Sequence, residues 1–235
     1  MDTLKKAADN MGIQLSDEKL KLFSVYKSLL VEWNQKFNLT NITESDEIDI
    51  KHFADSLSPA LSGELNGNLK LIDIGTGAGF PGIPLKIWND SLDVTLVDSL
   101  NKRVNFLKEV ISQLGLEGIE AVHGRAEEMG LSVPHRQVYD ICISRAVASL
   151  NTLSEYCMPF VKSGGWFIAM KGPAAEEEVQ EASKAIEILG GKIDRIEQFT
   201  LPGTDINYSI VMIRKVKSTP SKYPRGGGKP RKSPL

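Results

Sequence analysis

A glycine-rich turn, Gly75 to Gly82, is the part of the sequence best suited to bind a small molecule. It follows the short apolar run Leu71–Ile74 and leads into an apolar segment with helical spacing. In a parallel α/β sheet this junction lies at the carboxyl end of a strand, where ligands bind. Glycine lets backbone N–H groups approach a ligand, and the helix N-terminus adds a partial positive charge. The segment therefore predicts a ligand site, with an ordinary tight strand-to-helix turn as the alternative.

The spacing of the glycines distinguishes between two classes of cofactor. Gly75 and Gly77 match the first two positions of the G-x-G-x-x-G dinucleotide fingerprint, but Phe80 occupies the third and Pro81 follows it. A bulky ring and a proline make a poor cradle for a pyrophosphate. S-adenosylmethionine has no pyrophosphate and carries an ammonium group, which Asp73 could meet directly or through water. We therefore expect an S-adenosylmethionine site, with a nicotinamide dinucleotide site as the alternative.

An acidic residue ends the next predicted strand. The β-branched run Asp93–Asp98 places Asp98 23 residues after Gly75, close to the spacing of about 20 residues at which a carboxylate binds ribose hydroxyls. The alternative role of Asp98 is to cap the helix that begins near Lys102. The two roles are compatible, so we expect Asp98 to contact the ribose of a nucleoside cofactor.

Length and composition indicate an ordinary globular protein. The chain has 235 residues, 41% of them hydrophobic, which suits one large domain or one domain with an accessory subdomain. No apolar run approaches the length of about 18 residues that a membrane span requires, and the start of the chain lacks an apolar signal-peptide core. Its cysteines and histidines show neither a disulfide framework nor metal-ligand spacing. We therefore expect a cytoplasmic monomer with no membrane association and no metal.

Basic residues are concentrated at the end of the chain. Eight of them, and no acidic residue, lie between Arg214 and Leu235, whereas the other 213 residues carry 20 basic and 30 acidic side chains. A basic segment on an acidic body points to a polyanionic partner, which we expect to be nucleic acid. Four prolines and the run Gly226–Gly228 predict an extended, irregular tail. A solvated segment that aids solubility is the alternative.

Residues 1–62 are predicted to form an N-terminal helical subdomain. Ser16 is a candidate N-cap, and apolar residues follow it at spacings of three and four, a pattern typical of core packing. A second helix is expected from about Asp46 to Leu61. It carries His52 and Asp55, which lie three residues apart and therefore share a helix face. We expect them to be a buried polar pair that holds this helix to the sheet; a place beside the substrate is the alternative.

Strands and helices alternate from Lys70 onward, a pattern that predicts a doubly wound parallel sheet. Strands are expected near residues 70–75, 93–98, 118–122, 138–144, 165–171, 192–200 and 207–214, and the clearest helices at 101–115, 149–160 and 174–189. Only a short loop separates the last two strands, so they must pair antiparallel. Over residues 63–217 we predict an α/β class I methyltransferase fold, a Rossmann-like sheet of seven strands whose last strand is antiparallel. The basic tail occupies residues 218–235.

The ends of the third and fourth strands limit the chemistry. Ala126 and Glu127 can place a backbone N–H against a ring nitrogen of adenine, although Glu127 could instead complement a helix dipole. Residues 143–148 lack both the motif typical of amine methylation and a Pro-Cys nucleophile, while Cys142 and Cys157 are expected in the core. Guanine N7 has an in-plane lone pair and no proton. It therefore suits a site that only aligns donor and acceptor.

Several segments, in this order along nearly the whole chain, resemble the family of bacterial small-subunit ribosomal RNA 7-methylguanosine methyltransferases, also called glucose-inhibited division protein B. These segments are Trp33–Thr40, His52–Leu57, Leu71–Pro84, Asp98–Arg103, Gly124–Glu127, Ser144–Ala148, Met170–Gly172 and Tyr223–Arg225. The run Gly226–Gly228 departs from the family pattern, where a more cationic tail is expected.

The resemblance implies methyl transfer from S-adenosylmethionine to N7 of a guanine in 16S rRNA, either as free rRNA or within a small-subunit assembly intermediate. It implies that Asp98 holds the ribose of the cofactor. The other cofactor contacts that it implies are Gly75, Phe80, Ala126, Glu127 and Arg145. Gly77, in the same glycine turn, is expected to contact the cofactor as well. No side chain is identified as catalytic, and the alternatives are an NAD-dependent oxidoreductase and a non-catalytic RNA-binding module.

Overall fold

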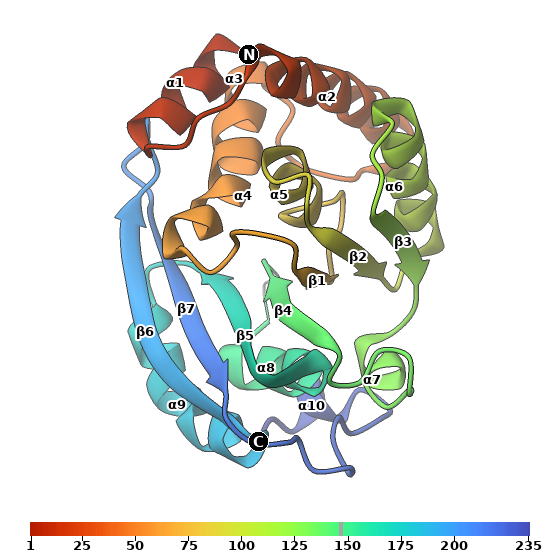
Figure 1. The fold of residues 1–235 in the computed structure, drawn as a ribbon, viewed down its shortest axis with the longest axis vertical. Coiled ribbons are helices and arrows are strands. Elements are labelled where there is room, and N and C mark those ends of the chain that lie inside the picture. Colours follow the sequence, from red (N-terminus) through yellow and green to blue (C-terminus); the bar gives the residue numbers. More distant parts are fainter. Residues whose placement is uncertain (146–147) are drawn as a thin grey trace.

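The computed structural model describes residues 1–145 and 148–235. Within these residues, seven strands form one sheet in the order β3-β2-β1-β4-β5-β7-β6 (Figure 1). Strands β1 to β5 pair in parallel, and β7 runs antiparallel to both β5 and β6. The strands are β1 (Lys70–Ile74), β2 (Asp93–Asp98), β3 (Ile119–His123), β4 (Tyr139–Ser144), β5 (Val161–Lys171), β6 (Gly191–Thr200) and β7 (Asn207–Lys215). The predicted doubly wound sheet with an antiparallel last strand is confirmed.

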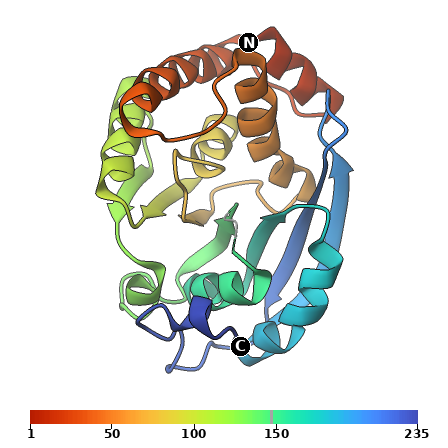
Figure 2. The ribbon, with the colours of Figure 1, turned by 180° about the vertical axis from the view of Figure 1, so that it is seen from behind.

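Helices cover both faces of the sheet, with the N-terminal helices, α5 and α6 on one face and α8, α9 and α10 on the other (Figure 1, Figure 2). The helices are α1 (Asp2–Asn10), α2 (Asp17–Phe37), α3 (Ser45–Glu47), η1 (Ile48–Ala54), α4 (Asp55–Leu57), η2 (Ser58–Ser62), α5 (Gly82–Trp88), α6 (Asn101–Leu114), α7 (Ala126–Met129), α8 (Leu150–Cys157), η3 (Met158–Phe160), α9 (Ala175–Ile188) and α10 (Lys229–Lys232). In the described parts of the chain, no helix has the length and apolar character needed to cross a membrane.

The central strands are apolar on both sides because helices bury both faces of the sheet. In β1, Leu71 belongs to the apolar cluster beneath the N-terminal helices, whereas Ile72 and Ile74 belong to the cluster beneath α8 and α9. Neighbouring β4 alternates in the same way, with Ile143 in the first cluster and Cys142 in the second. The sheet therefore separates two cores, and the near-continuous apolar runs of the sequence follow from this.

Helix α2 begins and ends where its sequence predicts. The Ser16 hydroxyl accepts a hydrogen bond from the Lys19 N–H at 3.3 Å, so the expected N-cap is confirmed. The helix ends at Asn38, whose φ of 49° is left-handed. Its apolar stripe packs on α5 and α6 and joins the first core, so the helical residues 1–62 share a core with the sheet. The stripe consists of Leu20, Phe23, Tyr26 and Leu30.

The segment expected to be one helix from Asp46 to Leu61 is helical throughout, but it is not a regular α-helix. Its central part, η1, is a π-helix, and η2 is a 3₁₀-helix. π-helical turns occur mostly as short stretches and often at functional sites. His52 lies in η1, and Asp55 begins α4.

The C-terminal tail is folded onto the body rather than extended. The Arg136 guanidinium donates hydrogen bonds to four backbone carbonyls, three of them in the tail. Those carbonyls belong to Gly130, Thr219, Pro220 and Tyr223. The tail therefore has fixed partners on the body even though its composition favours irregular chain.

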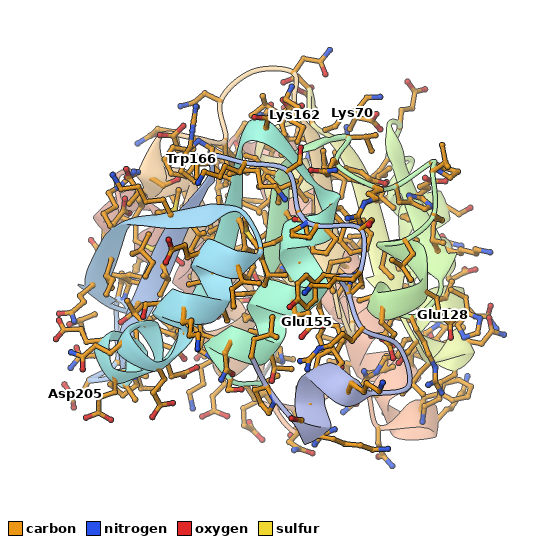
Figure 3. All side chains as sticks on the ribbon, turned by 90° about the horizontal axis from the view of Figure 1, so that it is seen from below. Lys70, Glu128, Glu155, Lys162, Trp166 and Asp205 are labelled. Carbon is orange, nitrogen blue, oxygen red and sulfur yellow. The ribbon has the colours of Figure 1, made fainter. Side chains whose placement is uncertain are left out.

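Two of the eight basic residues near the C-terminus serve the fold. Lys215 is buried and donates to the carbonyl of Met158 at 2.5 Å; burial lowers the pKa of Lys215 to about 7. Arg225 donates through Nε and Nη2 to the carboxylate of Glu155, at 2.8 and 2.6 Å. Glu155 lies on α8, beside the tail in Figure 3, and its side chain is fully buried. The positive charge available to a polyanionic partner is thus smaller than the sequence count.

Arg225→Ala is expected to lower the free energy of unfolding by about 3 kcal/mol, because it leaves the buried Glu155 carboxylate without its cation. Urea unfolding monitored by circular dichroism measures this difference. Lys229→Ala, at an exposed position of the same tail, is the control and should change the value by less than about 0.5 kcal/mol. Equal stability of Arg225→Ala and the unaltered chain would show that this pair does not hold the tail.

Candidate active site

A cavity of about 800 Å³ opens at the carboxyl ends of β1, β2, β3 and β4. Its wall also includes residues from the N-terminal helical region, from α8 and from the tail. Seven of the residues expected to contact the cofactor line it, although they come from four different strand ends. They are Gly75, Gly77, Phe80, Asp98, Ala126, Glu127 and Arg145.

The glycine turn after β1 holds its shape through backbone hydrogen bonds to β2. Gly75 and Thr76 donate their N–H groups to the carbonyl of Val97 at 2.9 and 3.1 Å. Gly75 and Gly77 have φ angles of 72° and 64°, in the left-handed region that favours glycine. Opposite the turn, Tyr26 of α2 donates its buried hydroxyl hydrogen to the carbonyl of Ala78. The turn is therefore shaped before any cofactor arrives.

Asp98 combines two roles at the end of β2. One carboxylate oxygen accepts the N–H of Leu100, the N-cap residue of α6, at 2.9 Å, but in the described part of the chain no side chain caps this helix, so the expected capping role of Asp98 is wrong. The other accepts the N–H of Gly77 at 3.0 Å and faces Arg103 at 3.3 Å. The carboxylate also lines the cavity. Contact between Asp98 and the cofactor ribose stays a prediction.

Asp73 supports the glycine turn from below. One of its carboxylate oxygens accepts the hydroxyl of Thr76 at 2.6 Å and the N–H of Gly82 at 2.9 Å. The side chain is fully buried, and this burial raises the pKa of Asp73 to about 7. The residue is not part of the cavity wall. A direct contact between Asp73 and the cofactor ammonium is therefore not what the structure favours.

Gly82 performs the packing role that the dinucleotide fingerprint gives to its third glycine. A Cβ atom at Gly82 would lie 2.3 Å from Cδ2 of Leu96 in β2 and 3.0 Å from an oxygen of Asp73. In the dinucleotide motif the third glycine allows this close helix–strand approach. In this chain the corresponding glycine is Gly82, two residues after the third motif position, which Phe80 occupies. Pattern matching therefore missed it.

An ion pair joins the end of β4 to the N-terminal helices. Arg145 Nη1 lies 2.7 Å from Oδ2 of Asp55, whose carboxylate is almost fully buried. The same nitrogen is 3.4 Å from the hydroxyl of Ser56, and Nη2 lies 3.4 Å from His52 Nδ1. The expected polar pair of His52 and Asp55 is thus present, with Arg145 between the helix and the sheet.

His52 and Phe80 belong to both the core and the cavity. Their rings stack with centroids 4.5 Å apart, and the Arg145 guanidinium carbon lies 4.8 Å from the Phe80 centroid. Burial, with a smaller contribution from the charge of Arg145, lowers the pKa of His52 to about 3. His52 is therefore neutral at physiological pH. It also lines the cavity, and a place beside the substrate stays a prediction.

Ala126 and Glu127 lie at the start of α7, on another side of the cavity. Glu127 stands in the first turn of this helix, so it also complements the helix dipole as the alternative interpretation held. Contact between these two residues and adenine stays a prediction. Residues 146–147, within the Ser144–Ala148 segment, lie outside the described residues.

Among the cavity residues that sequence patterns did not predict are Thr40, Tyr156 and Arg231. Thr40 follows α2, Tyr156 lies on α8, and Arg231 lies on α10 of the tail. Thr40 ends the segment Trp33–Thr40 that carries part of the family resemblance, which is the one signal that could have identified it. Tyr156 and Arg231 reach the cavity only through the folding of distant segments.

A model of the GidB family, described as rRNA small subunit methyltransferase G, matches residues 19–207. A relative named ribosomal RNA small subunit methyltransferase G from Alkaliphilus metalliredigens (strain QYMF) is 53% identical over 232 residues, covering 99% of this chain and 97% of the relative. Another of that name, from Acetivibrio thermocellus, is 54% identical over 234 residues, covering 99% and 95%. The chain belongs to this family.

As a GidB family member, the protein is an rRNA methyltransferase that uses S-adenosylmethionine. This confirms the predicted family, enzyme class and methyl donor, and it decides against the NAD-dependent oxidoreductase and the non-catalytic RNA-binding module. An rRNA substrate follows from the family as well. The roles of the individual cavity residues are not tested by family membership.

Solved structures with low sequence identity share the fold. The M. jannaschii TYW2 structure in complex with AdoMet has a TM-score of 0.54 and 15% identity, covering 69% of this chain and 77% of that chain. A branched-chain polyamine synthase mutein from Thermus thermophilus has a TM-score of 0.58 and 12% identity, covering 75% and 59%. Since one of these is a polyamine synthase by name, the shared sheet establishes the fold and leaves the reaction to the site.

Gly82→Ala is expected to destabilise the protein by about 2 kcal/mol, because the added methyl group overpacks the contact with Leu96. Thermal or urea unfolding measures the change. Gly226→Ala is the matched control, since a Cβ there has no atom within 4 Å. Wild-type stability in Gly82→Ala would show that α5 does not depend on this close approach.

A stability difference that depends on pH is expected for His52. Its pKa is about 3 in the folded protein against an ordinary value of 6.5, so between these values the unfolded chain binds a proton that the folded protein does not. Stability therefore falls as pH decreases through this window. His52→Gln should lose less stability than the unaltered protein between about pH 7 and pH 5, measured by urea unfolding. Parallel losses in both proteins would contradict the low pKa.

Proposed function

We propose that this enzyme transfers the methyl group of S-adenosylmethionine to N7 of one guanine in 16S rRNA, in a single in-line step without a covalent enzyme intermediate. Methylation at N7 follows from membership of the GidB family. The direct mechanism and the assignment of each cavity residue are our proposal. The observation that carries the mechanism is the composition of the cavity wall.

No thiol is available at the cavity for covalent catalysis. Across the described residues, the wall contains no cysteine and no lysine. Cys142 and Cys157 are fully buried in the core beneath α8, as expected from the sequence, and burial raises the pKa of the Cys142 thiol. Guanine N7 needs no proton removed before it attacks. The cavity therefore supports catalysis by alignment of the sulfonium methyl group with the N7 lone pair.

The pairing of Arg145 removes an electrostatic obstacle to this reaction. Methyl transfer moves the positive charge of the sulfonium onto the purine, so a free guanidinium beside the base would oppose it. Arg145 instead forms an ion pair with Asp55 at 2.7 Å and stacks on Phe80. The charge of Arg145 is therefore balanced by Asp55, which reduces its repulsion of a cationic product.

The arrangement of the wall supports one orientation of the cofactor. The turn from Gly75 to Phe80 would hold the methionine end, Asp98 the ribose, and Ala126 with Glu127 the adenine. Part of the remaining wall, which includes Thr40 and His52, is then left for the target base. Cofactor contacts of Gly77 and Arg145 belong to the same proposal.

The tail offers a cationic surface for the rRNA backbone. Four of its basic residues are exposed, and one of them, Arg231, lines the cavity. Phosphates beside the target guanine would meet this surface. The exposed basic residues of the tail are Lys222, Lys229, Arg231 and Lys232. We further propose that the protein acts as a monomer in the cytoplasm, on free 16S rRNA or on a small-subunit assembly intermediate.

The test is incubation with radiolabelled S-adenosylmethionine and either protein-free 16S rRNA or small subunits from cells that lack the gene for this protein. Nuclease digestion and mass spectrometry should find the label in 7-methylguanosine at one position. Label at another atom, or in no nucleoside of either substrate, would overturn the proposal. The two substrates also show whether free rRNA or the particle is preferred.

A further inference from the structure

The position of Thr40 is set by the end of α2. After Asn38 reverses the chain, the Asn34 side-chain oxygen accepts the N–H of Thr40 at 2.9 Å. This bond fixes the Thr40 backbone against the last turn of the helix. The residue is partly exposed and lines the cavity. Its hydroxyl therefore has a defined place at the cavity wall.

In the hydrogen-bond chain from Arg145 through His52 to Thr40, the donor and the acceptor of each bond can be assigned. A guanidinium only donates, so the Arg145 Nη2 contact at 3.4 Å makes His52 Nδ1 the acceptor. Because burial keeps the imidazole neutral, its single proton lies on Nε2. That nitrogen is 2.8 Å from the Thr40 hydroxyl oxygen, and it must donate to it. The Asp55 carboxylate holds Arg145 at the start of this chain.

The Thr40 hydroxyl oxygen accepts two hydrogen bonds, and its own hydrogen takes part in neither of them. The N–H of Ile42 donates to it at 3.0 Å, in addition to His52. Both hydroxyl partners seen within residues 1–145 and 148–235 are donors, so the two lone pairs of the oxygen are used. The remaining hydroxyl hydrogen is free to be donated to a ligand in the cavity. Asp55, Arg145 and His52 thus make Thr40 a donor rather than an acceptor.

The acceptor of this hydrogen should lie beside the reacting atom. On the Hoogsteen edge of guanine, O6 and N7 are neighbouring acceptors. A donor on O6 orients the base and leaves the N7 lone pair free for the methyl group. Adenine presents an N6 amino group at the same place, which a donor would repel. Thr40 would therefore orient the base and also select guanine over adenine.

We propose that the Thr40 hydroxyl, held as a donor by the chain from Asp55 through Arg145 and His52, donates a hydrogen bond to O6 of the target guanine. Thr40 thereby positions N7 for methyl transfer. This inference rests on the proposed function, because it assigns the acceptor of that reaction to this wall of the cavity.

The test compares Thr40→Val, Thr40→Ser and the unaltered enzyme in single-turnover methylation. The substrates are a reconstituted small subunit with guanine at the mapped target position and one with 2-aminopurine, which keeps N7 and lacks O6. Thr40→Val should be about tenfold slower on guanine, since it removes one hydrogen bond and leaves O6 without a donor. Thr40→Ser should stay within about twofold of the unaltered enzyme. On 2-aminopurine all three should react at equal rates.

Two controls separate this role from others. Thr43→Val, on the same loop but outside the cavity wall, should leave the rates unchanged. Calorimetric titration should give the same S-adenosylmethionine affinity for Thr40→Val as for the unaltered enzyme. Weaker cofactor binding would assign the hydroxyl to the cofactor instead, and an equal rate loss on both bases would indicate a merely structural role; either result overturns the inference.

The outcomes also distinguish this inference from the proposed function. If the unaltered enzyme forms no 7-methylguanosine, the proposed function fails. If it does, and Thr40→Val methylates guanine as fast as the unaltered enzyme, only the role of Thr40 is wrong. Should Thr40→Val fold poorly, Thr40→Ala is the second variant without the hydroxyl, and it should be slower on guanine but equal to the unaltered enzyme on 2-aminopurine; an equal rate on guanine would overturn the inference.

Discussion

The ion pair between Arg145 and Asp55 is the contact on which one wall of the cavity depends. It joins residues 90 apart in the sequence and connects the end of β4 to the N-terminal helices. The Asp55 carboxylate is buried, so separating it from the guanidinium would be costly. The orientation of Arg145 in turn sets His52 and the stacking on Phe80. The helices of residues 1–62 are therefore part of the site as well as part of the core.

Around the glycine turn, two carboxylates accept hydrogen bonds from backbone N–H groups. Asp73 holds the N–H of Gly82, and Asp98 holds those of Gly77 and Leu100. These bonds shape the glycine turn without a ligand, which reduces the ordering needed when a cofactor binds. The two aspartates differ in accessibility because Asp73 lies within β1 under the turn, whereas Asp98 ends β2 at the cavity. The aspartate at position 73 therefore supports the turn from within the core, whereas the aspartate at position 98 forms part of the cavity wall.

The tail shows how one segment supplies both packing and charge. Arg136 and Glu155 of the body bind it through backbone carbonyls and through Arg225. A tail held in this way presents its exposed cations in a fixed place, including Arg231 at the cavity. A free tail would have to lose conformational entropy on binding RNA. The glycine run Gly226–Gly228 therefore does not prevent the tail from packing.

The sequence by itself determined the sheet and the cofactor end of the site. Alternating apolar strands and helices are local patterns, and strand ends in a parallel sheet meet at one edge, so the glycine turn and Asp98 had to come together. Only the tertiary structure decided that Asp73 faces inward, that Gly82 carries the close packing, and that Thr40 and Arg231 reach the cavity. Those positions depend on contacts between segments far apart in the chain. No local spacing encodes such contacts, because they arise from how whole elements pack.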